Sequence, residues 1–98
     1  MPILKQSIRI MNIRGLHARA ANKFARLVET FKSDVRVIHQ GESANGVHRM
    51  DLLMLVAHQG CTIEIEVDGD DAEQAISALA ALVENGFGEL DEETGELS

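Results

Sequence analysis

Apolar side chains recur along this chain with two different periods, which predict where its strands and helices lie. Residues 3–11 and 61–67 alternate between apolar and polar positions, as is typical of strands that bury one face. Residues 18–31 and 72–83 repeat apolar side chains every three or four positions, which predicts two amphipathic helices.

The middle of the chain gives weaker signals. Residues 35–38 form a further predicted strand, and residues 40–42 have the composition of a hairpin turn that leads into a short return strand. Residues 47–57 favour a short helix, with a buried strand as the alternative. Asp70 is the predicted N-cap of the last helix, which we expect to end at Gly86.

The resulting order, β-α-β-β-α-β-α, combines one-sided strands with apolar-striped helices. Such elements favour helices packed on one face of an antiparallel sheet, an α+β architecture in two layers. A chain of 98 residues has room for one domain, which we place at residues 1–88. Residues 89–98 hold five acids and show no period, so we expect them to form an acidic, disordered tail.

Composition narrows the classes of protein further. With 45% apolar and 26% charged residues, the chain has the balance of a soluble globular protein. The apolar run 52–57 is too short to span a membrane and no secretion leader opens the chain, so we expect a cytoplasmic protein. Cys61 is expected to be buried, and His39, His48 and His58 to lie at the surface without a metal site.

Charge is distributed unevenly along the chain. All nine Lys and Arg residues lie at or before Arg49, whereas residues 67–98 hold ten of the sixteen acids and no base. The net charge of −7 argues against nucleic acid as the main ligand, because binding to a phosphate backbone needs a dominant positive field. The basic residues of the first half are expected instead to meet an acidic partner.

A histidine flanked by arginines lies where the first strand leads into the first helix. The N-terminus of a helix attracts anions, because its first N–H groups have no internal acceptor and its dipole adds positive charge. His17 at this point is a candidate nucleophile for an electrophilic phosphorus, with Arg19 as a bidentate partner and Gly15 allowing close backbone approach. Spacing alone leaves open the simpler reading that His17 caps the helix and the arginines are solvated.

The segment Gly15-Leu16-His17-Ala18-Arg19 resembles the active-site loop of the HPr family, the histidine-containing phosphocarriers of the bacterial phosphotransferase system. The likeness continues through 45–60, 60–65 and 78–88, and so covers about residues 3–89. This resemblance implies an open-faced β-sandwich, with three helices packed on one face of a four-stranded antiparallel sheet.

The resemblance also implies a role in a phosphoryl relay. Enzyme I takes a phosphoryl group from phosphoenolpyruvate and passes it to the carrier histidine, from which a IIA protein or domain removes it. By this likeness His17 accepts the group on Nδ1 and Arg19 stabilises it, in a phosphate-binding set of Ala18, Arg19, Ala20 and Arg14. The chain would then be a carrier rather than a turnover enzyme, without a cofactor.

Three positions depart from the family pattern. Ala20 replaces the usual proline, which we expect to tune the helix start without loss of function. His48 stands where some members carry a regulatory serine, so regulation by serine phosphorylation is not expected there. Arg14 either adds a cation to the phosphoryl site or faces solvent. The missing serine and the apolar run at 52–55 favour the regulatory, nitrogen-type branch over the sugar-uptake branch.

Partner docking is expected on the short helix. We assign Met50 and Leu53 to the docking surface, together with Arg49 and Lys23, and Met54 to the core. The expected partners carry acidic surfaces with apolar centres, and a carrier that visits two partners is expected to be a monomer. The alternatives are a phosphorylation-independent binding module that uses Met50 and Leu53, and a ferredoxin-like sensor of small molecules.

Overall fold

The computed structural model describes residues 3–90. It contains four strands, three α-helices and a short 3-10 helix in the predicted order: β1 (Ile3–Arg9), α1 (Ala18–Val28), β2 (Asp34–His39), β3 (Glu42–Asn45), α2 (Arg49–Met54), β4 (Thr62–Asp68), α3 (Ala72–Glu84) and η1 (Gly86–Gly88).

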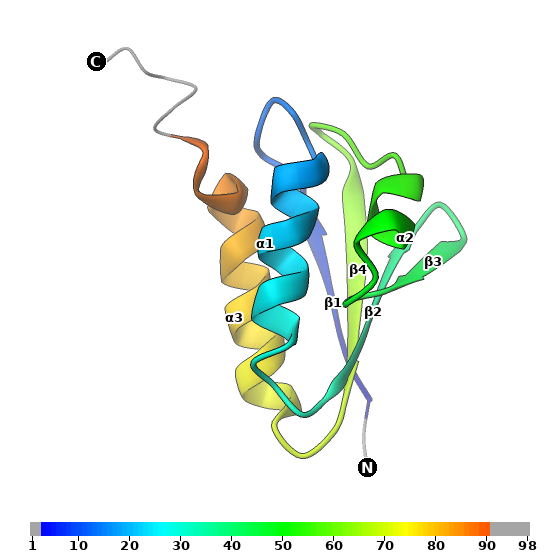
Figure 1. The fold of residues 1–98 in the computed structure, drawn as a ribbon, viewed down its shortest axis with the longest axis vertical. Helices are drawn as coiled ribbons and strands as arrows, with labels where there is room; N and C mark the ends of the chain where they lie inside the picture. The colour runs from blue at the N-terminus through cyan, green and yellow to red at the C-terminus, as the bar shows by residue number, and fades with distance from the viewer. Residues whose placement is uncertain (1–2, 91–98) are drawn as a thin grey trace.

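The four strands form one antiparallel sheet in the order β1-β4-β2-β3. Central strand β4 pairs Ile63 with Ile8 of β1 and Ile65 with Val37 of β2, so the apolar positions of three strands share one face. The helices cover that face and leave the other open, with α1 and α3 packed side by side (Figure 1). The fold is therefore the predicted open-faced β-sandwich.

Helix α1 supplies much of the core because its apolar stripe is unbroken. Ala20, Ala21, Phe24, Ala25 and Val28 are all buried, at the spacing that places them on one side of a helix. Phe24 and Phe87 are among the largest fully buried side chains. No helix among residues 3–90 is both long enough and apolar enough to cross a membrane.

Helix α2 is shorter than predicted, and the assignment of Met54 to the core is wrong. The helix spans six residues, and the Met54 side chain is 73% exposed. The buried side chains are Leu52 and Leu55, whereas Leu53 is partly buried against the core. Residues 52–57 are all apolar, so no polar side chain indicates which face of this segment points inward. The period of apolar residues therefore predicts the wrong buried face.

The predicted cap at Asp70 is also wrong, because the N-cap of α3 is the next residue, Asp71. The Asp71 carboxylate makes no capping bond to its own helix. It accepts hydrogen bonds from the backbone N–H groups of Lys32 and Ser33 and from Ser33 Oγ, at 2.8, 3.0 and 2.5 Å. These hydrogen bonds, led by the one from the Ser33 hydroxyl, hold the pKa of Asp71 below its ordinary value.

Burial differs from expectation at two further side chains. His39 is buried, because it follows Val35 and Val37 on the inward face of β2, and its Nδ1 lies 2.9 Å from Leu55 O. His48 and His58 lie at the surface as predicted. Cys61 is only partly buried, with Sγ 3.6 Å from His58 Nδ1. Residues 3–90 contain no cluster of three potential metal ligands among His, Cys, Asp and Glu.

Candidate functional site

The loop before α1 is fixed by close backbone packing. Gly15 has φ +66°, and a Cβ there would lie 2.6 Å from Ala57 O, so only glycine fits without movement. Next along the chain, the Leu16 N–H donates to the same carbonyl at 2.8 Å. His17 then takes the N-cap position of α1 in an extended conformation. The loop thus sets the direction in which the imidazole leaves the backbone.

One ring nitrogen of His17 is held by a buried carboxylate. Nε2 lies 2.5 Å from Glu89 Oε2, and the His17 and Glu89 side chains are 20% and 3% exposed. Asn12 Nδ2 donates to Glu89 Oε1 and to Gly15 O, both at 2.9 Å, and so ties the carboxylate to the loop. Since an ionised carboxylate only accepts, Nε2 carries the hydrogen, and in the neutral ring Nδ1 keeps its lone pair.

The electrostatics of the site favour an ionised Glu89. Burial alone would raise the pKa of this carboxyl. Hydrogen bonds from Asn12 and His17, with the positive charge of Arg19, outweigh burial and leave the pKa below its ordinary value. Arg19 Nε lies 3.9 Å from Glu89 Oε2. Carboxylate, imidazole and guanidinium therefore form one charged cluster at the surface.

The helix end adds a site for an anion beside the imidazole. The first helical hydrogen bond runs from Ala21 N to His17 O, at 2.7 Å. By helix geometry the N–H groups of Ala18 and Ala20 have no acceptor within the helix. They lie at the positive end of the dipole of this eleven-residue helix. Nδ1 of His17 makes no hydrogen bond with any residue from 3 to 90.

The other predicted site residues occupy different settings. Arg14 is exposed and forms no hydrogen bond or ion pair with residues 3–90. Lys23 Nζ donates to Phe87 O at 2.8 Å, and Arg49 Nε donates to Asn22 Oδ1 at 2.7 Å, so both cations help hold the fold. Met50 is 69% exposed, as a docking residue requires.

Two residues of the site, Glu89 and Asn12, escaped the sequence analysis. Glu89 was assigned to the disordered tail, which is wrong at this position, since Glu89 is 2% exposed and bonded to His17. Residues 91–98 of that tail lie outside the described part of the chain. One feature of the sequence does indicate burial here: Phe87 is a large apolar residue that follows Gly86. When Phe87 is buried, the residues next to it, including Glu89, are brought toward the core.

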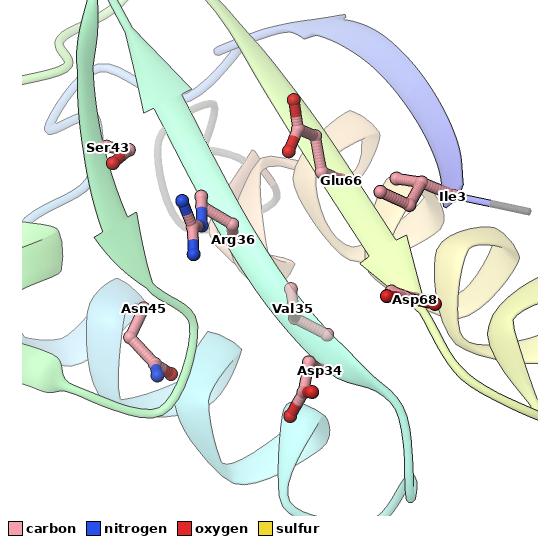
Figure 2. A pocket seen from close by; sticks show the side chains of 8 residues that line it. All are labelled: Ile3, Asp34, Val35, Arg36, Ser43, Asn45, Glu66 and Asp68. Atoms are coloured by element: carbon pink, nitrogen blue, oxygen red, sulfur yellow. The ribbon is translucent and has the colours of Figure 1, made fainter. Parts of the chain in front are cut away.

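A separate pocket of about 650 Å³ lies on the open face of the sheet, where side chains of β1, β2, β3 and β4 line it (Figure 2). Its lining includes Arg36, Asn45 and Glu66 and none of the predicted site residues.

Fold and site define a class of protein: a small open-faced sandwich that presents a partly exposed histidine at the N-terminus of its first helix, as phosphocarriers do. Residues 4–85 match the family described as the PTS HPr component phosphorylation site. The chain belongs to the HPr family, the phosphocarriers of the bacterial phosphotransferase system.

Individual relatives agree with this assignment. The phosphocarrier protein HPr of Neisseria meningitidis serogroup A is 48% identical over 87 residues, which cover 89% of this chain and 98% of that protein. The phosphocarrier protein NPr of Proteus mirabilis is 43% identical over 83 residues, or 84% and 92% of the two chains. HPr-C-His from Thermoanaerobacter tengcongensis has a similar crystal structure, with a TM-score of 0.84, 36% identity and coverage of 88% and 97%, and an HPr dimer from that organism is also similar.

Proposed function

We propose that this chain accepts a phosphoryl group on His17 from enzyme I and donates it to a IIA protein or domain. The observation that carries the proposal is the contact between His17 Nε2 and Glu89 Oε2. Because Nε2 holds its hydrogen toward the carboxylate, the Nδ1 lone pair is the nucleophile. Nδ1 forms the bond to phosphorus while the bond from phosphorus to the donor breaks, and no proton has to move.

The surroundings of His17 suit a group that is held briefly and passed on. The start of α1 supplies N–H donors from Ala18 and Ala20, and the guanidinium of Arg19 supplies positive charge close to the ring. Arg14 completes the proposed phosphate-binding set. Glu89 opposes these groups, because its negative charge repels a phosphoryl dianion. Since His17 is partly exposed, the next acceptor can reach the phosphoryl group.

The proposed docking surface for both partners lies on α2 and the neighbouring part of α1. Met50 supplies an exposed apolar centre, which Met54 extends. Arg49 and Lys23 add positive charge at its border, and Leu53 contributes only the part of its side chain that the core leaves exposed. We propose partners with acidic, apolar-centred surfaces, a monomeric carrier in the cytoplasm, and a role in the nitrogen-type branch.

Phosphoryl transfer in vitro tests the proposal. The folded protein is incubated with enzyme I, Mg²⁺ and phosphoenolpyruvate, and its intact mass is read before and after acid treatment. We expect an acid-labile gain of one phosphoryl group in the wild type and none in His17→Ala. An unchanged mass with active, cognate enzyme I would overturn the proposal.

The exposed Met50 and Met54 side chains also favour a second function, a binding module that acts without phosphorylation. Binding of a partner to His17→Ala distinguishes the two functions. A binding module keeps its partner and its control over that partner when the histidine is lost, whereas a carrier loses that control.

A further inference from the structure

The pocket on the open face of the sheet contains an arginine without a partner in the described chain. Arg36 lies on the exposed side of β2, between Val35 and Val37, which point into the core. Asn45 of β3 and Glu66 of β4 lie directly opposite it, one on either side (Figure 2). The Arg36 guanidinium nevertheless makes no hydrogen bond or ion pair with residues 3–90. It is therefore available to a ligand in the pocket.

Both neighbours of Arg36 are engaged by other groups. Glu66 Oε2 lies 3.6 Å from Lys5 Nζ, so Lys5 and not Arg36 neutralises this carboxylate. Asn45 Oδ1 accepts from the Val47 N–H at 3.0 Å, which leaves the amide of Asn45 only its N–H donors. A guanidinium and an amide donor at neighbouring positions suit a carboxylate, which a guanidinium binds through two parallel hydrogen bonds.

The other end of the pocket has the opposite charge. Asp34 of β2 lies directly opposite Asp68 of β4, and both side chains are exposed. Like charges at directly opposite positions repel each other, and neither carboxylate forms an ion pair with residues 3–90. Ile3 of β1, on the other side of Asp68, is 52% exposed and adds apolar surface. This end therefore suits a cationic group carried on an apolar stem.

The pocket carries both signs of charge, so a ligand of one sign matches only half of it. A diamine satisfies the two aspartates but leaves the Arg36 guanidinium facing a further cation. An inorganic anion binds Arg36 but is repelled by the neighbouring carboxylates. A zwitterion whose two charged ends are separated by an apolar chain satisfies both halves. The volume of about 650 Å³ is within the range of small-molecule sites.

We propose that this pocket binds a free amino acid with a basic side chain, of which lysine is the model. Arg36 binds the α-carboxylate, and Glu66, opposite Arg36 in the sheet, accepts from the α-ammonium. Asp34 and Asp68 bind the terminal cation. Positions two apart on one strand share a face and lie about 7 Å apart, which the four-carbon stem of lysine spans. This binding is independent of phosphoryl transfer, because the pocket lies on the face opposite the helices (Figure 1).

Titration of the ¹⁵N-labelled full chain with L-lysine, followed by NMR at neutral pH and constant ionic strength, tests the proposal. We expect saturable shifts in the pocket segments of β2, β3 and β4, and none at the start of α1. For a ligand of about ten non-hydrogen atoms on an open surface, we expect Kd of about 1 mM. L-Norleucine, which lacks the terminal ammonium, and cadaverine, which lacks the carboxylate, should each bind about tenfold more weakly or worse.

Two variants each remove one half of the recognition. Arg36→Gln and Asp34→Asn change exposed side chains, so the fold should be kept, and each should raise Kd for lysine by about tenfold. Arg9→Gln is the matched control, because Arg9 is an exposed arginine of β1 outside the pocket, and it should bind lysine like the wild type.

Three results would overturn the proposal. Shifts that rise without saturation would show that lysine has no site here. Equal binding of cadaverine and lysine would show that the acids attract any cation. Wild-type affinity in Arg36→Gln would show that the guanidinium does not bind the carboxylate.

Discussion

At each end of the molecule a carboxylate joins two distant segments of the chain, but the two carboxylates have different roles. At the lower end in Figure 1, Asp71 at the start of α3 binds the backbone and hydroxyl of residues 32–33. At the upper end, Glu89 beyond α3 binds His17 and Asn12. Both carboxylates have lowered pKa values and both join segments far apart in the sequence.

The partners of the two carboxylates account for the difference in purpose. Asp71 accepts only from groups that do not titrate near neutral pH, so its contacts serve stability. Glu89 accepts from an imidazole, whose second nitrogen is thereby prepared for chemistry. The upper end also tolerates unfavourable features, among them Val56, a non-glycine residue at φ +50°, and a buried Asn12 Oδ1 without a hydrogen-bond partner in the described chain. Such features concentrate where function constrains the fold.

The largest expected effect comes from removing the charge of Glu89. Glu89→Gln leaves the shape of the site but no longer specifies which ring nitrogen carries the hydrogen. We expect kcat for phosphoryl transfer to His17 to fall by about tenfold or more, with little change in KM. Single-turnover transfer from phosphorylated enzyme I measures this effect. Glu84→Gln, which removes an exposed acid at the end of α3, is the control, and an equal loss there would contradict a specific role for Glu89.

A pair of glycine substitutions compares the site loop with the β2–β3 hairpin. Gly15→Ala combines left-handed strain with a Cβ 2.6 Å from Ala57 O, and we expect it to destabilise the fold by about 2 kcal/mol or more. Gly41→Ala has the same disfavoured sign of φ but nothing within 4 Å of its Cβ, so we expect a cost of about 1 kcal/mol. Urea unfolding measures both, and equal costs would show that the loop is not tightly packed.

Asp71→Asn should act on stability alone. Its hydrogen bonds favour the ionised carboxylate, so we expect the variant to melt several degrees below wild type while keeping the wild-type rate of phosphoryl transfer. Asp70→Asn, one residue earlier and exposed, is the matched control and should melt like the wild type. A slower transfer by Asp71→Asn would contradict the division of purpose between the two ends.

The same contact predicts a pH dependence. The folded-state pKa of Asp71 lies below its ordinary value of 3.8, so its stabilisation is present above that value and is lost as pH falls through the folded pKa. We expect the difference in Tm between wild type and Asp71→Asn to be constant above about pH 5 and to shrink below pH 4. A difference that grows on acidification would have the wrong sign.

The smallest expected effect concerns salt. Arg14 and Arg19 are exposed near the acceptor histidine, so partners with acidic surfaces should be steered toward it. We expect the second-order rate of transfer from enzyme I to fall a few-fold between about 0.05 and 0.5 M salt. A rate independent of salt would mean that this charge does not guide docking.

Sequence alone predicts the parts of the fold where one local pattern dominates. The alternation of β4 and the stripe of α1 each have a polar side, so burial follows directly from the period. The apolar run at Leu52–Leu55 lacks that contrast, and the wrong residue was placed in the core. Asp71 and Asp70 are adjacent acids, and only the position of residues 32–33 decides between them.

The residues of the candidate site also differ in how well the sequence reveals them. His17, Gly15 and Arg19 are neighbours in the sequence, so a local motif reveals them. Glu89 and Asn12 are 77 residues apart, and they meet only because η1 folds back against the start of α1. A buried carboxylate in a strongly acidic terminal segment has only the indirect signature of the large apolar residue Phe87 before it, since burial depends on tertiary contacts that composition does not encode.

The most direct test is to locate the phosphorus atom on the ring. After transfer from enzyme I to ¹⁵N-histidine-labelled protein, NMR couplings between phosphorus and nitrogen identify the phosphorylated atom. Because Glu89 holds Nε2–H, we predict phosphorus on Nδ1 of His17, with the hydrogen still on Nε2. Phosphorus on Nε2, or on a histidine other than His17, would contradict the role assigned to the carboxylate.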